Sequence, residues 1–471
     1  MNIIFKRRLV FVLALLTVPA LLVMVHDARS DSDLTECFWS PVTKQCIPDE
    51  QLFIQPAAEL AAAQTQLFED GLKQFRAQWS VFPRIDGEWG LGPTFLASSC
   101  EGCHNNSGRG KYPDLVGKGV FQQLVRVSLP GADASGTPAA HPAYGDQIQV
   151  FSVFGDSISQ PVTGEADVYV DWSHENKTLG DGTEVALRRP VMRIAKPAYG
   201  PLGESTMMSL RNTPVAYGLG YLDAVPDELI LKLAAQQKAQ GLNGRPNYVR
   251  DDLNGKISLG RFGWKANQPN LKQQVAAAHI GDMGITSALY MDQNCPKAQT
   301  QCQAVPLNGI PELTQPMFDS VTLFLAGVEA PQRSKAAQPQ FAQGEKLFQA
   351  VGCSGCHVPE LKTGKYPLLP AIENKPFAAY TDLLLHDMGE DLADNRPDFK
   401  AGGRDWRTAP LWGIGLSKRV NGSTHFLHDG RARNVTEAIL WHGGEAKKSR
   451  DQFVQLKKEE RDGLLDFVNA L

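Results

Sequence analysis

Beyond residue 25 the chain has no apolar run long enough to span a bilayer, and it has no excess of positive charge. The net charge is −4, and residues 1–30 hold Lys6, Arg7, Arg8 and Arg29 against Asp27, so the remaining chain carries about −7. This balance argues against nucleic acid as a partner. A mildly acidic surface instead suits a small basic protein partner.

The N-terminus has the pattern of an export leader. Three basic residues at 6–8 precede an apolar run of 17 residues at 9–25, and a polar stretch follows. Cleavage near residue 30 fits this pattern, and an uncleaved membrane anchor at 1–30 remains an alternative because of the length of the run. Either outcome places the rest of the chain outside the cytoplasm, and we expect a bacterial periplasm.

Cysteine is scarce, and half of the eight cysteines fall into two Cys-x-x-Cys-His pentapeptides. The first contains Cys100, Cys103 and His104, and the second contains Cys353, Cys356 and His357. This spacing lets both thiols form thioethers to one haem while the adjacent histidine binds the iron. A zinc site would need two cysteine pairs to converge and would not need a histidine after each pair. The sequence therefore predicts two covalently attached c-type haems.

The other four cysteines form two local pairs, Cys37 with Cys46 and Cys295 with Cys302. Both pairs lie in sequence typical of loops. In an oxidising compartment such pairs are expected to form disulfides, so we predict two short-loop disulfides.

Three loose repeats divide the chain into halves. Gly71-x-x-x-Phe75 precedes the first pentapeptide and Gly344-x-x-x-Phe348 precedes the second. Further on, residues 211–218 resemble 407–413, and Asp-Met-Gly occurs at 282–284 and 387–389. Relative to its pentapeptide, each repeat lies on the same side in both halves, which favours an internal duplication. We predict an N-terminal haem domain at 31–335 and a C-terminal cytochrome c-like haem domain at 336–471, with a polar linker at 331–340.

The expected fold class is mainly α, with one small antiparallel β insertion in the N-terminal half. Residues 147–151 and 166–172 alternate at period two, and 184–188 follow the turn-like sequence at 180–182, so the insertion is placed at about 146–196. Apolar spacing predicts helices at 227–240, 318–328 and 452–471.

Several motifs together resemble the bacterial di-haem oxidoreductase family, whose members are described as peroxidase-like or thiol-oxidoreductase-like. The motifs lie at 90–95, 107–110, 260–266, 281–286, 385–389 and 426–432. More distantly, the second half is similar to the bacterial di-haem cytochrome c peroxidases and to the di-haem maturase of methylamine dehydrogenase. In those relatives one haem transfers electrons and the other, with an openable sixth position, reacts with hydrogen peroxide.

The resemblance also implies ligands for the C-terminal haem. In the relatives, the helix after a His-Asp-Gly-like loop delivers the distal ligand, and here that helix, residues 435–441, is followed by His442. We therefore predict His442 as the distal ligand, with Met388 and His386 as alternatives. His442 as a hydrogen-bonded surface residue is the remaining interpretation.

For the N-terminal haem the distal ligand stays open between Met283, His279, His141 and His174. The place of a distal acid in the relatives falls on Asp223, although Asp223 is also suited to cap a helix. Calcium between the halves is a further implication of the resemblance, at Asn212, Thr408 and Pro410. Trp264 and Trp412 are candidates for an electron relay, or for packing alone.

Two classes of function remain. The first is a peroxidase-like enzyme that reduces hydrogen peroxide at one haem and exchanges electrons with a small donor or acceptor protein through the other. The second is a di-haem electron carrier without substrate chemistry. The large insertions favour the enzyme, because a carrier needs only a compact module around each haem.

Overall fold

The computed structural model describes residues 38–39, 46–57, 60–82, 88–112, 122–153, 162–305, 309, 311–331 and 339–471. The predicted leader at 1–30, Cys37 and most of the predicted linker at 331–340 lie outside the described residues. None of the described helices combines the length and the apolar character that a bilayer crossing requires.

Helices hold 34% of the described residues and strands 21%, in several small sheets. The fold is therefore mixed, and the prediction of a mainly α fold with one small β insertion is wrong. Most of the additional strands have only two to four residues. Strands this short cannot develop the period-two alternation by which a strand is found in sequence.

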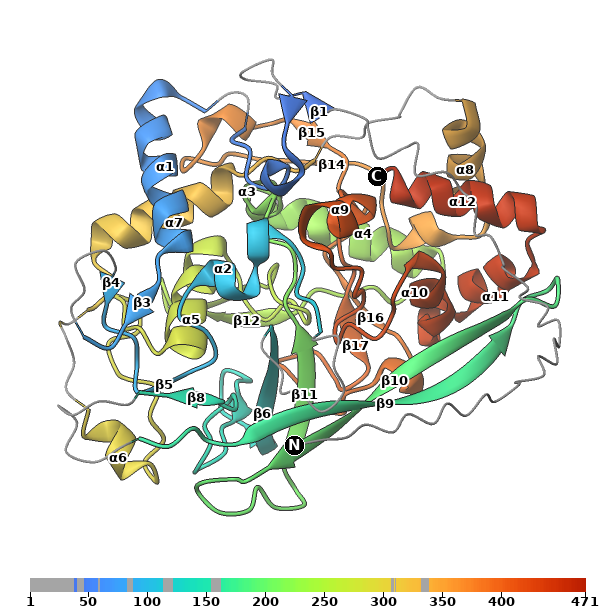
Figure 1. Cartoon of the computed structure of the whole chain (residues 1–471). Coiled ribbons are helices and arrows are strands. Elements are labelled where there is room, and N and C mark those ends of the chain that lie inside the picture. The colour runs from blue at the N-terminus through green and yellow to red at the C-terminus, as the bar shows by residue number, and fades with distance from the viewer. Residues whose placement is uncertain are drawn as a thin grey trace, which may run out of the picture. The chain divides into compact units, whose positions relative to one another are not determined.

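The α-helices, including short ones, are interspersed with strands along the described chain, and the last four follow one another without a strand (Figure 1). They are α1 (Ala62–Arg76), α2 (Cys100–Cys103), α3 (Leu219–Asp223), α4 (Asp227–Ala239), α5 (Leu271–Met283), α6 (Thr300–Gln303), α7 (Gln315–Gly327), α8 (Pro339–Ala350), α9 (Ser417–Asn421), α10 (Val435–Trp441), α11 (Lys447–Gln455) and α12 (Lys458–Asn469). The predicted helices at 227–240 and 318–328 are confirmed as α4 and α7. The one predicted at 452–471 is two helices, α11 and α12, separated at Leu456 and Lys457.

The strands pair mostly as antiparallel ribbons, with one three-stranded sheet in the order β11–β6–β7. They are β1 (Phe38–Trp39), β2 (Cys46–Ile47), β3 (Trp79–Ser80), β4 (Glu88–Trp89), β5 (Thr94–Phe95), β6 (Gln123–Ala132), β7 (Pro138–Ala139), β8 (Phe151–Ser152), β9 (Asp167–Thr178), β10 (Glu184–Ala195), β11 (Met207–Asn212), β12 (Tyr248–Asp251), β13 (Lys256–Leu259), β14 (Leu361–Lys362), β15 (Pro376–Phe377), β16 (Leu385–Asp387) and β17 (Asp405–Arg407).

The longest ribbon is the hairpin β9–β10, which confirms two of the three predicted strands of the insertion. Its register pairs Asp167 with Ala195 and Thr178 with Glu184. The third predicted strand, 147–151, is mostly loop, because only Phe151 belongs to a strand there. Gln147 instead forms an isolated bridge with Arg126 of β6.

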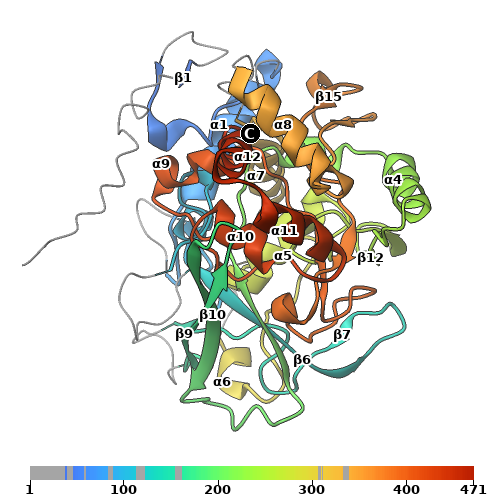
Figure 2. The same ribbon diagram turned by 90° about the vertical axis from the view of Figure 1, so that its right-hand side faces the viewer.

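The hairpin reaches from the β6–β11 sheet to the C-terminal helices (Figures 1 and 2). At its tip, the amide of Gly180 donates to the carbonyl of Val454 in α11 at 2.8 Å, and Arg461 of α12 donates to Asp181 at 2.6 Å. These two hydrogen bonds attach the N-terminal half of the chain to the helices that follow the second pentapeptide.

Two helix pairs share one mode of packing. In the first pair, a Cβ at Gly71 of α1 would overlap the backbone oxygen of Ser320 in α7. In the second, a Cβ at Gly344 of α8 would overlap the backbone oxygen of Gly463 in α12. Each glycine thus permits a close crossing of two helices, and the repeated Gly-x-x-x-Phe sequence has the same structural role in both halves.

The phenylalanine one turn after each glycine packs on the second helix and on the pentapeptide histidine. The ring of Phe75 lies 5.2 Å from that of Phe324 and 6.3 Å from that of His104. The ring of Phe348 lies 5.5 Å from that of Phe467 and 6.4 Å from that of His357. The crossing therefore positions each histidine.

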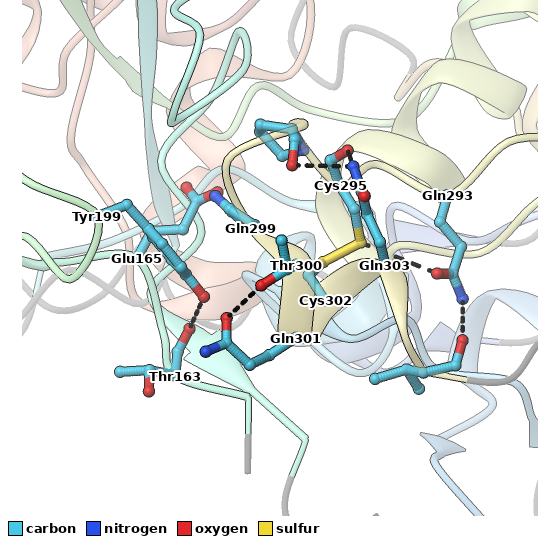
Figure 3. The surroundings of a disulfide bond; sticks show 12 residues. Thr163, Glu165, Tyr199, Gln293, Cys295, Gln299, Thr300, Gln301, Cys302 and Gln303 are labelled. Atoms are coloured by element: carbon cyan, nitrogen blue, oxygen red, sulfur yellow. Dashed lines mark hydrogen bonds between the residues drawn. A yellow bond between two sulfur atoms is a disulfide. The ribbon is translucent and has the colours of Figure 1, made fainter. Parts of the chain in front are cut away.

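Cys295 and Cys302 form a disulfide beside α6 (Figure 3). Between them, Gln299 donates to the buried carboxylate of Glu165, so this loop is tied to the segment before β9. The other predicted pair includes Cys37 and stays a prediction.

The crossing of α8 and α12 offers a matched test. We expect Gly344→Ala to lower the free energy of unfolding by about 1–3 kcal/mol, because the new methyl has no space against Gly463 and the Cβ of Phe467. Gly463→Ala, whose Cβ would point into open space, should be neutral or stabilising by up to about 1 kcal/mol through helix propensity. Chemical denaturation of the two variants measures both effects. Equal effects would contradict the close crossing.

Candidate haem-binding sites

The first pentapeptide forms the short helix α2. Ser99 caps it, since its Oγ accepts from the amide of Gly102 at 3.1 Å, and His104 follows as the C-cap. Nδ1 of His104 bonds to the carbonyl of Pro214 at 2.8 Å, so Nε2 is the nitrogen left for a metal. Burial lowers the pKa of His104 to about 4, against the opposing effect of the Pro214 carbonyl. His104 is therefore neutral at pH 7, the form that binds iron.

A cavity of about 250 Å³ lies beside His104 and both of its cysteines. Its walls come from α1, β6, α5 and the segments at 211–217, 262–268 and 407–412, so both halves of the chain build it. Six residues considered from the sequence line it, namely Asn212, Trp264, His279, Met283, Pro410 and Trp412. His104 is thus placed against a space enclosed by distant segments.

The polar lining of this cavity is strongly cationic. It contains Arg109, Arg126, Arg211 and Arg407, and the one carboxylate among its described lining residues is Asp282. Four polar groups of the lining are buried without a hydrogen-bond partner among the described residues, namely the donors Nε of Arg109 and Nε1 of Trp412 and the acceptors Oε1 of Gln123 and of Gln268. Buried donors without acceptors indicate a missing acidic ligand, which fits a haem because its porphyrin carries carboxylate side chains.

Asp282 is a site residue that the sequence reasoning missed. Burial raises its pKa, while a hydrogen bond from Gln147 at 2.8 Å opposes the shift. The carboxylate is near both thiols, because after burial it is the next cause that raises the pKa of Cys100 and of Cys103 to about 12. The repeated Asp-Met-Gly tripeptide at 282–284 was the available signal, but only the packing of α5 places Asp282 in the cavity.

The second pentapeptide begins in a 3-10 turn, Cys353–Gly355, directly after α8. Nδ1 of His357 bonds to the carbonyl of Tyr380 at 2.9 Å and leaves Nε2 available. Burial lowers the pKa of His357 to about 4, against the opposing effect of the Tyr380 carbonyl. None of the four pentapeptide cysteines is in a disulfide, so all four thiols are available for thioethers.

His442 lies where the sequence placed it, at the C-terminal end of α10. Its Nδ1 bonds to the carbonyl of Ala438 at 2.7 Å, so Nε2 is again the free nitrogen. Burial lowers the pKa of His442, which favours its neutral form. Two neutral histidines with free Nε2 atoms are the donor set that an axial pair requires.

Of the alternatives at this site, His386 is fully engaged. Its Nε2 contacts Asp382 at 2.9 Å, and its Nδ1 contacts Glu445 at 3.1 Å and Sγ of Cys356 at 3.6 Å, so both ring nitrogens already contact protein groups. Burial lowers the pKa of His386, but the bonds to Asp382, Cys356 and Glu445 outweigh it and raise the pKa to about 12. His386 is therefore a buried cation between two carboxylates. Met388 packs at the edge of the core cluster that contains Trp441 and stays an alternative.

The candidate distal ligands of the first site differ in whether they line the cavity. His141 bonds through both ring nitrogens, to the carbonyl of Leu202 and the amide of Ala143, and His174 is exposed on β9. Neither lines the cavity. His279 and Met283 do line it, and Nδ1 of His279 bonds to the carbonyl of Val275 at 2.8 Å.

Asp223 does not line the cavity. Its carboxylate accepts from the hydroxyl of Tyr366 at 2.8 Å and from the amide of Leu271, the first residue of α5, at 3.0 Å. These bonds give Asp223 a structural role at the start of α5, whereas a capping role for α4 was the alternative considered from the sequence.

The residues considered for calcium already have hydrogen-bond partners. Oδ1 of Asn212 accepts from Gln123 at 2.9 Å, and the carbonyl of Thr408 accepts from Thr381 and from the guanidinium of Arg407. Pro410 lies in the wall of the cavity. A cation already bonded to the Thr408 carbonyl gives the calcium prediction no support.

Comparison with known proteins adds the family. No curated protein matches the chain in sequence. A family model described as "Di-haem oxidoreductase, putative peroxidase" matches residues 49–471, which include both pentapeptides and all the segments that line the cavity. The resemblance found in the sequence motifs is confirmed, and the chain belongs to the di-haem oxidoreductase family.

Proposed function

We propose that this oxidoreductase attaches one haem at Cys100 and Cys103 and another at Cys353 and Cys356, and that it reduces hydrogen peroxide at the first. His104 would hold the haem at which peroxide is reduced, and His357 and His442 would hold the haem that supplies the electrons. The repeated unit of crossed helices, phenylalanine and histidine supports two haems held in the same way.

The observation that carries this proposal is the difference between the two sites. A cavity lined by Asp282 and by arginines lies beside His104, so that site has space for a small substrate and polar groups that can act on it. His279 and Met283 also line this cavity, and the proposal requires that neither of them binds the iron. At the second site His442, whose Nδ1 is held by the carbonyl of Ala438, would bind the iron together with His357, which suits electron storage.

Peroxide reduction joins one hydrogen peroxide, two electrons and two protons to give two waters. Bound haem supplies the redox chemistry at the O–O bond. The chain must supply proton transfer between the two oxygens, a general acid–base task. Asp282 is suited to it, because it lies in the cavity and its raised pKa brings it nearer to working pH. We assign it this role in place of Asp223.

We place the protein in the bacterial periplasm, with a small electron-donor protein as its partner. The export leader, the paired cysteines and covalent haem attachment support an oxidising compartment. The mildly acidic chain supports a basic donor.

Stopped-flow mixing of the fully reduced protein with hydrogen peroxide tests the proposed reaction. We expect haem oxidation within seconds, and a slowing by about 10²–10⁴-fold in Asp282→Asn, because a positioned acid–base group contributes a factor of that size. Oxidation of the donor should change little, since it needs no proton shuttle.

Asp223→Asn is the matched comparison, because it alters another buried carboxylate outside the cavity. If Asp223→Asn slows the peroxide step and Asp282→Asn does not, our assignment of the proton carrier is wrong. A reduced parent protein that peroxide does not oxidise would support the electron carrier instead.

The ligand assignment makes a separate prediction. His442→Ala should convert one haem from low spin to high spin, because it removes one of two axial nitrogens, and His442→Met should raise that haem's reduction potential. Optical and electron paramagnetic resonance spectra report the first change, and a potentiometric titration reports the second. Unchanged spectra in His442→Ala together with altered spectra in Met388→Ala would identify Met388 as the ligand.

A further inference from the structure

Charge pairing divides the four arginines of the cavity beside His104 into two kinds. Arg126 contacts Asp146 at 2.5 Å, and Arg211 contacts Asp398 at 3.0 Å. Arg109 and Arg407 also line the cavity, but neither has a carboxylate within salt-bridge distance among the described residues. The cavity therefore contains two guanidinium groups without counter-ions.

Arg109 is held in place through its backbone and left unpaired at its side chain. The amide of Asn421 donates to its carbonyl at 2.7 Å, and its guanidinium carbon lies 5.9 Å and 5.5 Å from the ring centres of Trp264 and Phe426. The side chain is 6% exposed, and Nε has no described partner. Burial lowers the pKa of Arg109, but a guanidinium remains charged in proteins.

The guanidinium of Arg407 is oriented by two hydrogen bonds. Nε donates to the carbonyl of Gly263 at 3.0 Å and Nη1 to the carbonyl of Thr408 at 3.1 Å, which leaves Nη2 for another acceptor. Burial lowers its pKa to about 10, although the charge of Asp382 opposes this. Asp382 is not its salt-bridge partner, because that carboxylate bonds to Gln237 and His386.

Arg109 is buried and Arg407 partly buried, and such cations without a counter-ion among the described residues are costly unless anions accompany them. We propose that Arg109 and Arg407 bind the two propionate carboxylates of the haem attached at Cys100 and Cys103. The number of free charges matches, and the planar fork of a guanidinium suits a carboxylate. This inference rests on the proposed haem attachment at the first pentapeptide.

The assignment gives Arg407 a role that its repeat partner does not have. Residues 407–413 repeat 211–218, and Arg211 occupies the corresponding place, but Arg211 is neutralised by Asp398. Arg407 comes from β17 in the C-terminal half and reaches the haem site of the N-terminal half. Haem binding at the first site would therefore also tie the two halves together.

The test uses the haem-loaded protein and the variants Arg109→Met and Arg407→Met. Resonance Raman spectra report the bending modes of the propionates, which respond to their hydrogen bonding. We expect each variant to shift these modes for one haem and to lower that haem's reduction potential, because the lost cation favoured the ferrous state. Arg126→Met, which removes a cation already paired with Asp146, should leave the propionate modes in place.

Arg407→Lys separates charge from geometry. It should restore the potential and leave the propionate modes shifted, since an ammonium keeps the charge but not the fork. Arg407→Lys also tests the proposal if Arg407→Met does not fold.

Unchanged propionate modes in both methionine variants and in Arg407→Lys would overturn the proposal. Addition of formate to the parent protein gives a second test. Saturable spectral changes that Arg407→Met abolishes would also overturn the proposal, because the arginines would then bind a free carboxylate. A protein without haem at Cys100 and Cys103 would contradict the proposed function itself, a result that haem stoichiometry separates from the others.

Discussion

Close helix crossings at two glycines set the geometry on which the rest of this structure depends. At Gly71 and Gly344 the absence of a Cβ lets the helix backbone touch that of its partner helix. The phenylalanine one turn later then packs on both the partner helix and a pentapeptide histidine. A backbone carbonyl holds Nδ1 of each histidine, so that both imidazoles present Nε2 in the same way.

The two sites then differ in what faces the histidine. At His357 the helix α10 brings a second neutral imidazole, and Arg189 and Arg431 stack on Trp441, the residue before His442. At His104 the described lining of the cavity contributes four arginines and one carboxylate, together with His279 and Met283. Placing one reactive and one storage centre in a single chain needs this asymmetry, because two-electron chemistry at one haem draws its second electron from elsewhere.

Local sequence predicted the features that local interactions determine. The pentapeptides, the histidine after α10, the hairpin at β9–β10 and the helices α4 and α7 each have a signature within a few residues. Features set by distant pairing were missed or misassigned. β6 pairs with β11 across some 80 residues of chain, and β16 pairs with β17 through three residues on each strand, so neither pair was visible.

The same limit applies to the site residues. From sequence, His386 was an alternative to His442, and only the structure shows that its ring nitrogens contact Asp382 and Glu445. Asp282 lines the cavity and Asp223 does not, because the position of α5 decides which carboxylate reaches it. That Arg109 and Arg407 have no counter-ion among the described residues is a property of the folded surroundings alone.

We expect both pentapeptides to attach haem, and the mass of the mature protein measures this. Protein from cells competent in cytochrome c maturation should carry two covalently bound haems per chain, and a variant with Cys353→Ala and Cys356→Ala should carry one. A mature protein whose mass shows no haem, or a double variant that still carries two, would show that the pentapeptides do not attach haem in this way.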